Sequence, residues 1–161
     1  MKQGLTLKIV RTGLALTVLV SLLSACAPRT TREQSQVVDG LKLDYGLIAG
    51  EAIRAHPAGH PEADMHEGPP ADQRNYHVVL AVFEASSGRR IADADVSMAL
   101  SGPGHPGFGS IPMEPMKVTG QETYGRYVVL PEPGRYRLEF RVRTVGRHQP
   151  IRARFELQRP E

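Results

Sequence analysis

Residues 134–143 read Gly-Arg-Tyr-Arg-Leu-Glu-Phe-Arg-Val-Arg, and this stretch decides the fold class. Apolar side chains occupy every second position from Tyr136 to Val142, with charged side chains between them. Because successive side chains of a strand point to opposite faces, the alternation predicts a strand with one buried face and one solvated face. Residues 151–158 repeat the pattern with Ile-Arg-Ala-Arg-Phe-Glu-Leu-Gln, so a second strand of this kind is expected.

Four segments upstream have the pattern of further strands, at residues 41–48, 76–84, 96–100 and 127–130. Segment 76–84 is apolar on both faces, which is typical of a central strand. Turns rich in Gly, Pro and Ser separate the segments, and only residues 51–56 suggest a single helical turn. Short strands at regular spacing predict an all-β sandwich of about seven antiparallel strands over residues 37–161.

The N-terminus has the three parts of a secretory signal peptide. A basic segment precedes a mostly apolar run at residues 13–20, which is too short for a comfortable membrane span. Residues 23–26, Leu-Ser-Ala-Cys, resemble the bacterial lipobox, whose cysteine is lipidated and becomes the first residue of the mature chain. Cys26 is the single cysteine of the chain and lies where a lipobox needs it. An ordinary signal peptide with a chance cysteine is the alternative.

The lipobox resemblance implies a division of the chain into three parts. Residues 1–25 are the lipoprotein signal peptide, residues 26–36 are the lipidated cysteine with a flexible linker, and residues 37–161 are the folded domain. Ala27 follows the cysteine, and resemblance to known lipoproteins then implies the outer membrane. The lipid would tether the domain to the cell envelope on the periplasmic side.

The formal net charge of +3 belongs to the leader and not to the mature protein. The leader holds three of the 20 basic residues, namely Lys2, Lys8 and Arg11, and the 17 that remain balance the 17 acidic residues. Arginines alternate with core positions at 135, 137, 141, 143, 152 and 154, and Glu139 and Glu156 lie among them. This mixture favours a solvated sheet face over an anion-binding or lipid-headgroup patch, and nucleic acid is not an expected partner.

Imidazole, carboxylate and thioether side chains gather in one short stretch. Residues 56–66 read His-Pro-Ala-Gly-His-Pro-Glu-Ala-Asp-Met-His, and in an extended conformation His60, Glu62, Asp64 and His66 share a face. Imidazole with carboxylate suits divalent transition metals, and a thioether adds a preference for copper, above all Cu(I). A Pro-rich surface loop that binds no metal is the alternative.

A second segment adds soft donors. Residues 111–116 read Ile-Pro-Met-Glu-Pro-Met, and two methionines between prolines in a loop are hard to explain by core packing. Met113 and Met116 are therefore candidate ligands. Met98 alternates with Val96 and Leu100, so it is expected in the core.

These motifs resemble a known family. Residues 60–66 look like the His-Leu-Glu-Ala-Asp-Ile-His segment of the periplasmic P19/Tp34 iron-transport-associated metal-binding family. Pro115-Met116 followed by Tyr124-Gly125 resembles that family's Pro-Met…His-Tyr-Gly segment, and the strand from Gly134 also resembles YtkA-like and FixH-like modules. The resemblance spans residues 40–142, and it implies an Ig-like β-sandwich that binds copper or another divalent metal.

Carried over by position, the resemblance implies three metal ligands and two assisting residues, namely His60, Glu62, Met116, His66 and Met113. The family's fourth ligand is the histidine before Tyr-Gly, and Thr123 occupies that position here with the spacing from Met116 kept. A threonine is not a metal ligand of that kind. Three histidines could replace it: His66, His77 and His105. For His77, a hydrogen-bonded residue of the sheet is the alternative interpretation.

The sequence therefore predicts a lipid-anchored periplasmic protein that sequesters or delivers copper or another transition metal, or acts as an accessory in iron uptake. A non-catalytic Ig-like envelope interaction module without metal is the alternative. An enzyme is not expected, because the chain has no Gly-x-Ser-x-Gly, His-Glu-x-x-His or phosphate-cradling glycine motif. The membrane is the expected partner through the lipid. A metal-uptake or envelope protein and a second copy of the chain stay open as further partners.

Overall fold

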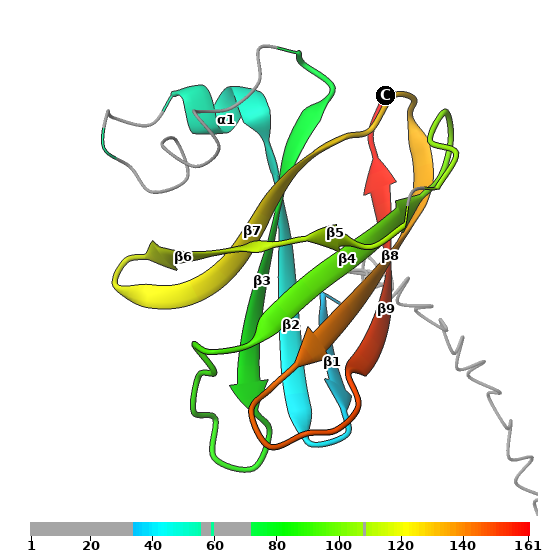
Figure 1. The fold of residues 1–161 in the computed structure, drawn as a ribbon. Helices are drawn as coiled ribbons and strands as arrows, with labels where there is room; N and C mark the ends of the chain where they lie inside the picture. The colour runs from blue at the N-terminus through cyan, green and yellow to red at the C-terminus, as the bar shows by residue number, and fades with distance from the viewer. Residues whose placement is uncertain (1–33, 56–58, 60–71, 108) are drawn as a thin grey trace, which may run out of the picture.

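The structure is a computed structural model, which describes residues 34–55, 59, 72–107 and 109–161. Within these residues the chain forms nine strands and one short helix (Figure 1). The elements are β1 (Ser35–Val38), β2 (Leu41–Ala49), α1 (Gly50–Arg54), β3 (Asn75–Glu84), β4 (Asp95–Ser101), β5 (Ile111–Pro112), β6 (Glu114–Val118), β7 (Gln121–Val129), β8 (Gly134–Arg143) and β9 (Ile151–Arg159). The predicted leader, Cys26 and most of the linker lie outside the described residues.

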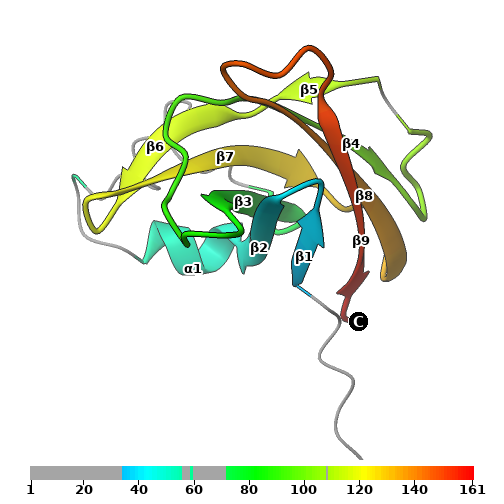
Figure 2. The ribbon, with the colours of Figure 1, turned by 90° about the horizontal axis from the view of Figure 1, so that it is seen from below.

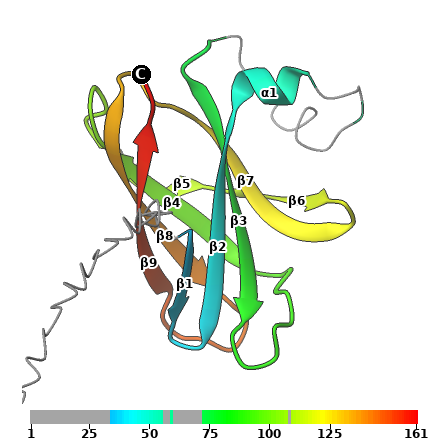
Figure 3. The same ribbon diagram turned by 180° about the vertical axis from the view of Figure 1, so that it is seen from behind.

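Two antiparallel sheets face each other, and this confirms the predicted all-β sandwich. One sheet has the order β1-β2-β3-β7-β6 and the other the order β5-β4-β8-β9. Seen from below in Figure 2, the two sheets form separate layers, and seen from behind in Figure 3 the five-stranded sheet lies toward the viewer. The two alternating stretches that decided the fold class are β8 and β9, which pair with each other from Gly134↔Arg159 to Val142↔Ile151.

The space between the sheets is filled by the apolar members of the alternating patterns. An aromatic group joins the layers, because Tyr45 of β2 lies 4.8 Å from Phe155 of β9 and 6.3 Å from Phe140 of β8 between ring centroids. Both phenylalanines are buried, and each such ring contributes about 1.5–3 kcal/mol by burial. Met98 is fully buried among these side chains, as the sequence pattern predicts.

The segment from residue 111 to 118 differs from the loop that the sequence suggested. It forms β5 at the edge of the four-stranded sheet and β6 at the edge of the five-stranded sheet. The Met113 amide between them donates to the Val96 carbonyl at 2.9 Å. The chain therefore crosses from one sheet to the other at Met113. Pro112 and Pro115 fit this path, because proline is tolerated on edge strands, where a missing amide costs little.

The charged face of β8 and β9 is solvated and internally paired. Arg154 donates to Glu139 at 2.8 Å, and this hydrogen bond lowers the pKa of the Glu139 carboxyl. Arg141 also lies 3.6 Å from Glu139, and Arg135 lies 3.7 Å from Glu156. This arrangement is the solvated sheet face that the alternation favoured. Among the described residues, no helix is both long enough and apolar enough to cross a membrane.

The start of β8 is fixed by a buried tyrosine. The Tyr136 hydroxyl accepts the Glu132 amide proton at 3.2 Å and lies 2.6 Å from the Pro103 carbonyl and 2.8 Å from the Glu132 carbonyl. A side chain at Gly102 would place its Cβ 2.3 Å from the Tyr136 ring, so the glycine leaves the space that the ring fills. A tyrosine that bonds the backbone a few residues upstream is a feature of Ig-like sandwiches.

We expect Tyr136→Phe to lower the free energy of unfolding by about 1–3 kcal/mol, because the Glu132 amide and two carbonyl groups lose their partner in three partly buried hydrogen bonds. Tyr76→Phe on β3, where the side chain is partly exposed, is the control and is expected to change stability by less than about 0.5 kcal/mol. Urea unfolding followed by circular dichroism measures both. Equal effects of the two substitutions would contradict this role for Tyr136.

Candidate metal centre

The outer face of the five-stranded sheet, defined as the face turned away from the four-stranded sheet, carries a buried histidine. In β3, Val78, Leu80 and Val82 point into the core between the sheets. Because side chains alternate along a strand, His77 and Val79 point to the outer face. His77 is nevertheless fully buried, with 0% of its surface exposed. A side chain on the outer face can be buried only if something covers it.

The helix α1 is part of that cover. Figure 2 shows α1 on the outer side of the five-stranded sheet, below the strands in that view. Gly50 packs so closely that a Cβ there would lie 3.0 Å from the Asn75 carbonyl oxygen at the start of β3. Ile53 and Met116 are both buried, yet neither belongs to the core cluster between the sheets. The outer face thus carries a second, smaller buried layer.

The strand register brings Met116 into this layer. Met116 of β6 pairs with Thr123 of β7, and His77 of β3 pairs with Tyr127 of the same strand. Directly paired residues of an antiparallel ladder point to the same side of the sheet. Gly125 lies between Thr123 and Tyr127 along β7, so it also belongs to the outer face. Side chains from β3 and β6 can therefore approach each other above Gly125.

The missing side chain at Gly125 is what lets them meet. A Cβ at this position would lie 2.5 Å from the His77 Nε2 atom and 3.0 Å from the Met116 Sδ atom. The imidazole nitrogen and the thioether sulfur therefore lie at most 5.5 Å from each other, packed over the Gly125 backbone. We call the side chains of His77 and Met116 over this glycine the Gly125 cradle. Its donor set, a nitrogen and a sulfur, fits a soft transition-metal ion.

Two neighbours on β7 set the orientation of these donors. The His77 ring stacks on the Tyr127 ring at a centroid distance of 4.7 Å and an interplanar angle of 30°. The Thr123 hydroxyl donates to the Met116 carbonyl at 3.4 Å. The threonine at the family's histidine position therefore bonds the backbone of β6.

The entry to β3 is held by a charged turn five residues before His77. Asp72 accepts the Arg74 amide at 2.8 Å and lies 2.6 Å from the Arg74 guanidinium. This hydrogen-bonded pair lowers the pKa of the Asp72 carboxyl to about 2. The Asn75 amide also donates to the Asp72 carbonyl at 3.0 Å. The turn fixes where β3 begins and therefore which face His77 occupies.

The candidate metal ligands that the sequence nominated do not all lie in one place. Met116 lies on the outer face, whereas Met113 is 5% exposed and packs in the core between the sheets. The argument that core packing could not explain the two methionines is thus wrong for Met113. His60, Glu62 and His66 lie outside the described residues, so their role as ligands stays a prediction. Among the described residues no three histidine, cysteine, aspartate or glutamate side chains form a metal-binding group.

The two other histidines lie elsewhere on the described fold. His105 belongs to the loop after β4 of the four-stranded sheet, where its Nδ1 atom accepts the Gly107 amide at 3.3 Å. His148 is an exposed residue between β8 and β9. The proximity of His77 to Met116 was not identified from the sequence. The signal that pointed to it was the replacement of the family's histidine by Thr123, which made His77 one of three candidate substitutes.

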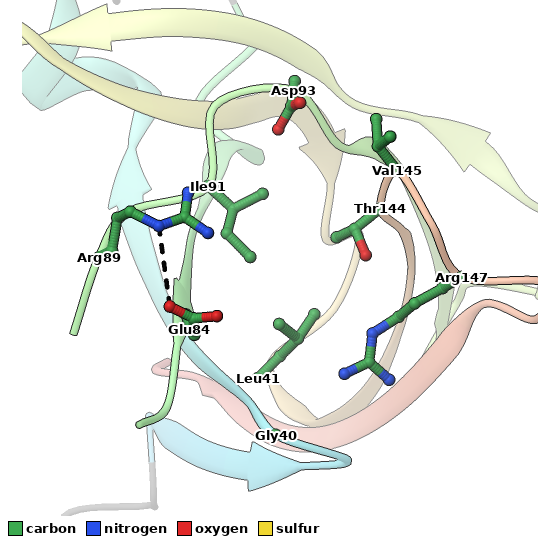
Figure 4. A pocket seen from close by; sticks show the side chains of 9 residues that line it. All are labelled: Gly40, Leu41, Glu84, Arg89, Ile91, Asp93, Thr144, Val145 and Arg147. Carbon is green, nitrogen blue, oxygen red and sulfur yellow. Dashed lines mark ion pairs between the residues drawn. The ribbon is translucent and has the colours of Figure 1, made fainter. Parts of the chain in front are cut away.

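A pocket of about 290 Å³ lies at the other end of β2 from α1, and it has a different character. Figure 4 shows side chains of both charges around it, with Glu84 and Arg89 paired at 3.7 Å. Arg147 at its rim donates to the Asp39 carbonyl at 2.6 Å. No histidine or methionine lines this pocket, so it offers no soft donors.

Solved structures with the fold of this chain include the following three. FetP of uropathogenic Escherichia coli strain F11, as isolated, aligns with a TM-score of 0.59 and 13% identity over 80% of this chain and 93% of that chain. Copper-reconstituted P19 of Campylobacter jejuni gives 0.58 and 11% over 79% and 93%. A DUF4426 family protein of Pseudomonas aeruginosa PAO1 gives 0.53 and 13% over 78% and 96%. No family model and no curated protein sequence matches the chain. The resemblance to P19-like proteins is thus confirmed at the level of the fold.

We expect Gly125→Ala to lower the free energy of unfolding by about 1–3 kcal/mol, the usual cost of overpacking a filled site. The new methyl group would collide with the His77 ring, which is fully buried and stacked on Tyr127. Gly109→Ala is the matched control, because a Cβ there meets nothing within 4 Å. Thermal unfolding measures both variants, and a Gly125→Ala protein as stable as the control would contradict the close packing.

Proposed function

We propose that this protein binds copper on the outer face of its five-stranded sheet and sequesters or delivers it in the periplasm. The observation that carries the proposal is the position of Met116. A thioether is buried outside the main core, on the face of the sheet that also holds the buried imidazole of His77. The Met116 position is also the one that the resemblance to the P19/Tp34 family assigns to a metal ligand.

The fold neighbours support copper as the metal. Copper-bound forms of FetP and of P19 are among the structures that share this fold. The donor chemistry agrees, because thioether and imidazole together favour copper over hard cations such as Mg²⁺ or Ca²⁺. His60, Glu62 and His66 are proposed as further ligands on the strength of their motif. Met113 is left out, because it packs between the sheets.

We further propose that the protein is anchored in the outer membrane by a lipid on Cys26 and faces the periplasm. The support is the lipobox-like segment at residues 23–26 and the basic and apolar leader before it. The predicted linker ends at residue 36, but β1 begins at Ser35, so the segment between Cys26 and Ser35 would act as the flexible linker between the lipid and the sandwich. A metal-uptake or envelope protein is the proposed partner that receives the copper. The proposal includes no catalytic step.

The interaction module without metal is the less favoured candidate. The exposed large hydrophobic residues of the described chain are Val37, Val129 and Val145. They belong to β1, to the end of β7 and to the segment after β8, so no single element presents them together. A docking surface would need a contiguous apolar patch.

Copper binding is tested by titrating the purified protein with Cu(I) under anaerobic conditions against a chromophoric chelator. We expect Met116→Leu to weaken Cu(I) binding about tenfold or more, which corresponds to about 1.4 kcal/mol. Met113→Leu is the matched control and is expected to bind as the wild type does, because its side chain lies in the core. Both substitutions conserve volume, so the fold should tolerate them. A wild-type protein that neither binds copper nor gains thermal stability from it would refute the proposal.

Lipid anchoring is tested by fractionating cells that express the full chain. We expect the wild type in the membrane fraction and Cys26→Ser in the soluble periplasmic fraction, because the serine cannot carry the thioether-linked lipid. Thr30→Ala in the linker is the control and should fractionate as the wild type does. Membrane association that survives Cys26→Ser would contradict the lipid anchor.

A further inference from the structure

We propose that His77 is a ligand of the bound metal, that its Nε2 atom and the Met116 Sδ atom coordinate the same ion, and that this pair selects Cu(I). The inference rests on the proposed function and extends it to a residue that the sequence motifs do not assign and to an oxidation state. Both atoms lie over Gly125, at 2.5 Å and 3.0 Å from the position that a Cβ would take there, so they are at most 5.5 Å apart.

The sheet geometry makes this meeting unusual. His77 and Met116 stand on β3 and β6, which are separated by β7. Neighbouring strands lie about 4.8 Å apart, so the two backbones are roughly twice that distance from each other. A side chain at position 125 would stand between the two donors. Glycine removes this barrier, so the two donors approach each other over β7.

The two donors are also held in place before any ion arrives. His77 is fully buried, and its ring stacks on Tyr127. Met116 is 8% exposed on the outer face of an edge strand. A ligand whose rotamer is fixed by its neighbours loses little freedom on binding, which favours affinity. Val79 pairs directly with Gly125, so an apolar side chain of β3 also stands beside the two donors on the outer face.

The chemistry of the pair points to a monovalent soft ion. Thioether is a soft donor that favours Cu(I), and imidazole is a good ligand for copper as well. His105, the other described candidate for the missing histidine, lies in a loop of the four-stranded sheet. His77 is therefore the described histidine that the fold brings to Met116.

The first test compares Cu(I) affinity in His77→Leu and in His148→Leu, using the purified full chain and a chromophoric chelator. We expect His77→Leu to bind Cu(I) at least tenfold more weakly and His148→Leu, an exposed control, to bind as the wild type does. Circular dichroism and the Tm of the metal-free proteins show whether each variant folds. A folded His77→Leu protein with wild-type Cu(I) affinity would overturn the inference.

The second test needs no variant, so it holds even if His77→Leu fails to fold. Ag(I) serves as a diamagnetic probe for Cu(I), and ¹⁵N NMR follows the histidine rings of the wild type. The His77 ring is identified through its contact with Tyr127. We expect Ag(I) to shift the His77 Nε2 resonance far more than the Nδ1 resonance. Ag(I) that binds and leaves Nε2 unshifted would overturn the role of His77 alone, whereas a wild type that binds neither Ag(I) nor Cu(I) would overturn the proposed function as well.

Discussion

The close approach of His77 and Met116 over Gly125 is the constraint on which the proposed metal centre depends. Side chains on strands that are not neighbours normally cannot meet, because the side chains of the strand between them fill the space. Here the middle strand presents a glycine at the crossing point, and the Cβ it lacks would lie within 3.0 Å of both donor atoms. The absence of a side chain at Gly125 thus allows a nitrogen donor and a sulfur donor to lie close together.

The two faces of the five-stranded sheet differ in what they carry. The inner face of the five-stranded sheet packs on β8 and β9, and the aromatic contacts among Tyr45, Phe140 and Phe155 hold the layers together. The outer face carries Ile53, His77 and Met116 under its own cover, outside that core cluster. Substitutions at the proposed metal centre therefore change a smaller, separate buried layer, and the sandwich retains its main source of burial energy.

The sandwich could be predicted from the sequence because apolar and polar residues alternate without interruption along β8 and β9. Such an alternation fits a strand with one buried face and does not fit a helix. It misjudged residues 111–118, where the chain crosses between sheets at Met113 and neither a period of two nor a loop composition describes the path. The motif nominated Met116 as a candidate ligand, but nothing in it indicated that His77 lies close to Met116. That proximity depends on how β3 and β6 pair with β7. The register between strands that are far apart in the sequence cannot be predicted from a local sequence pattern.

The most direct test of the central claim is X-ray absorption spectroscopy at the copper edge on the wild-type protein loaded with Cu(I). If Met116 and His77 hold the ion, the spectrum will show one sulfur scatterer together with the multiple scattering of at least one imidazole ring. A first shell made only of nitrogen and oxygen would exclude Met116, and a shell without imidazole scattering would exclude His77. Either result would contradict a copper site built across Gly125.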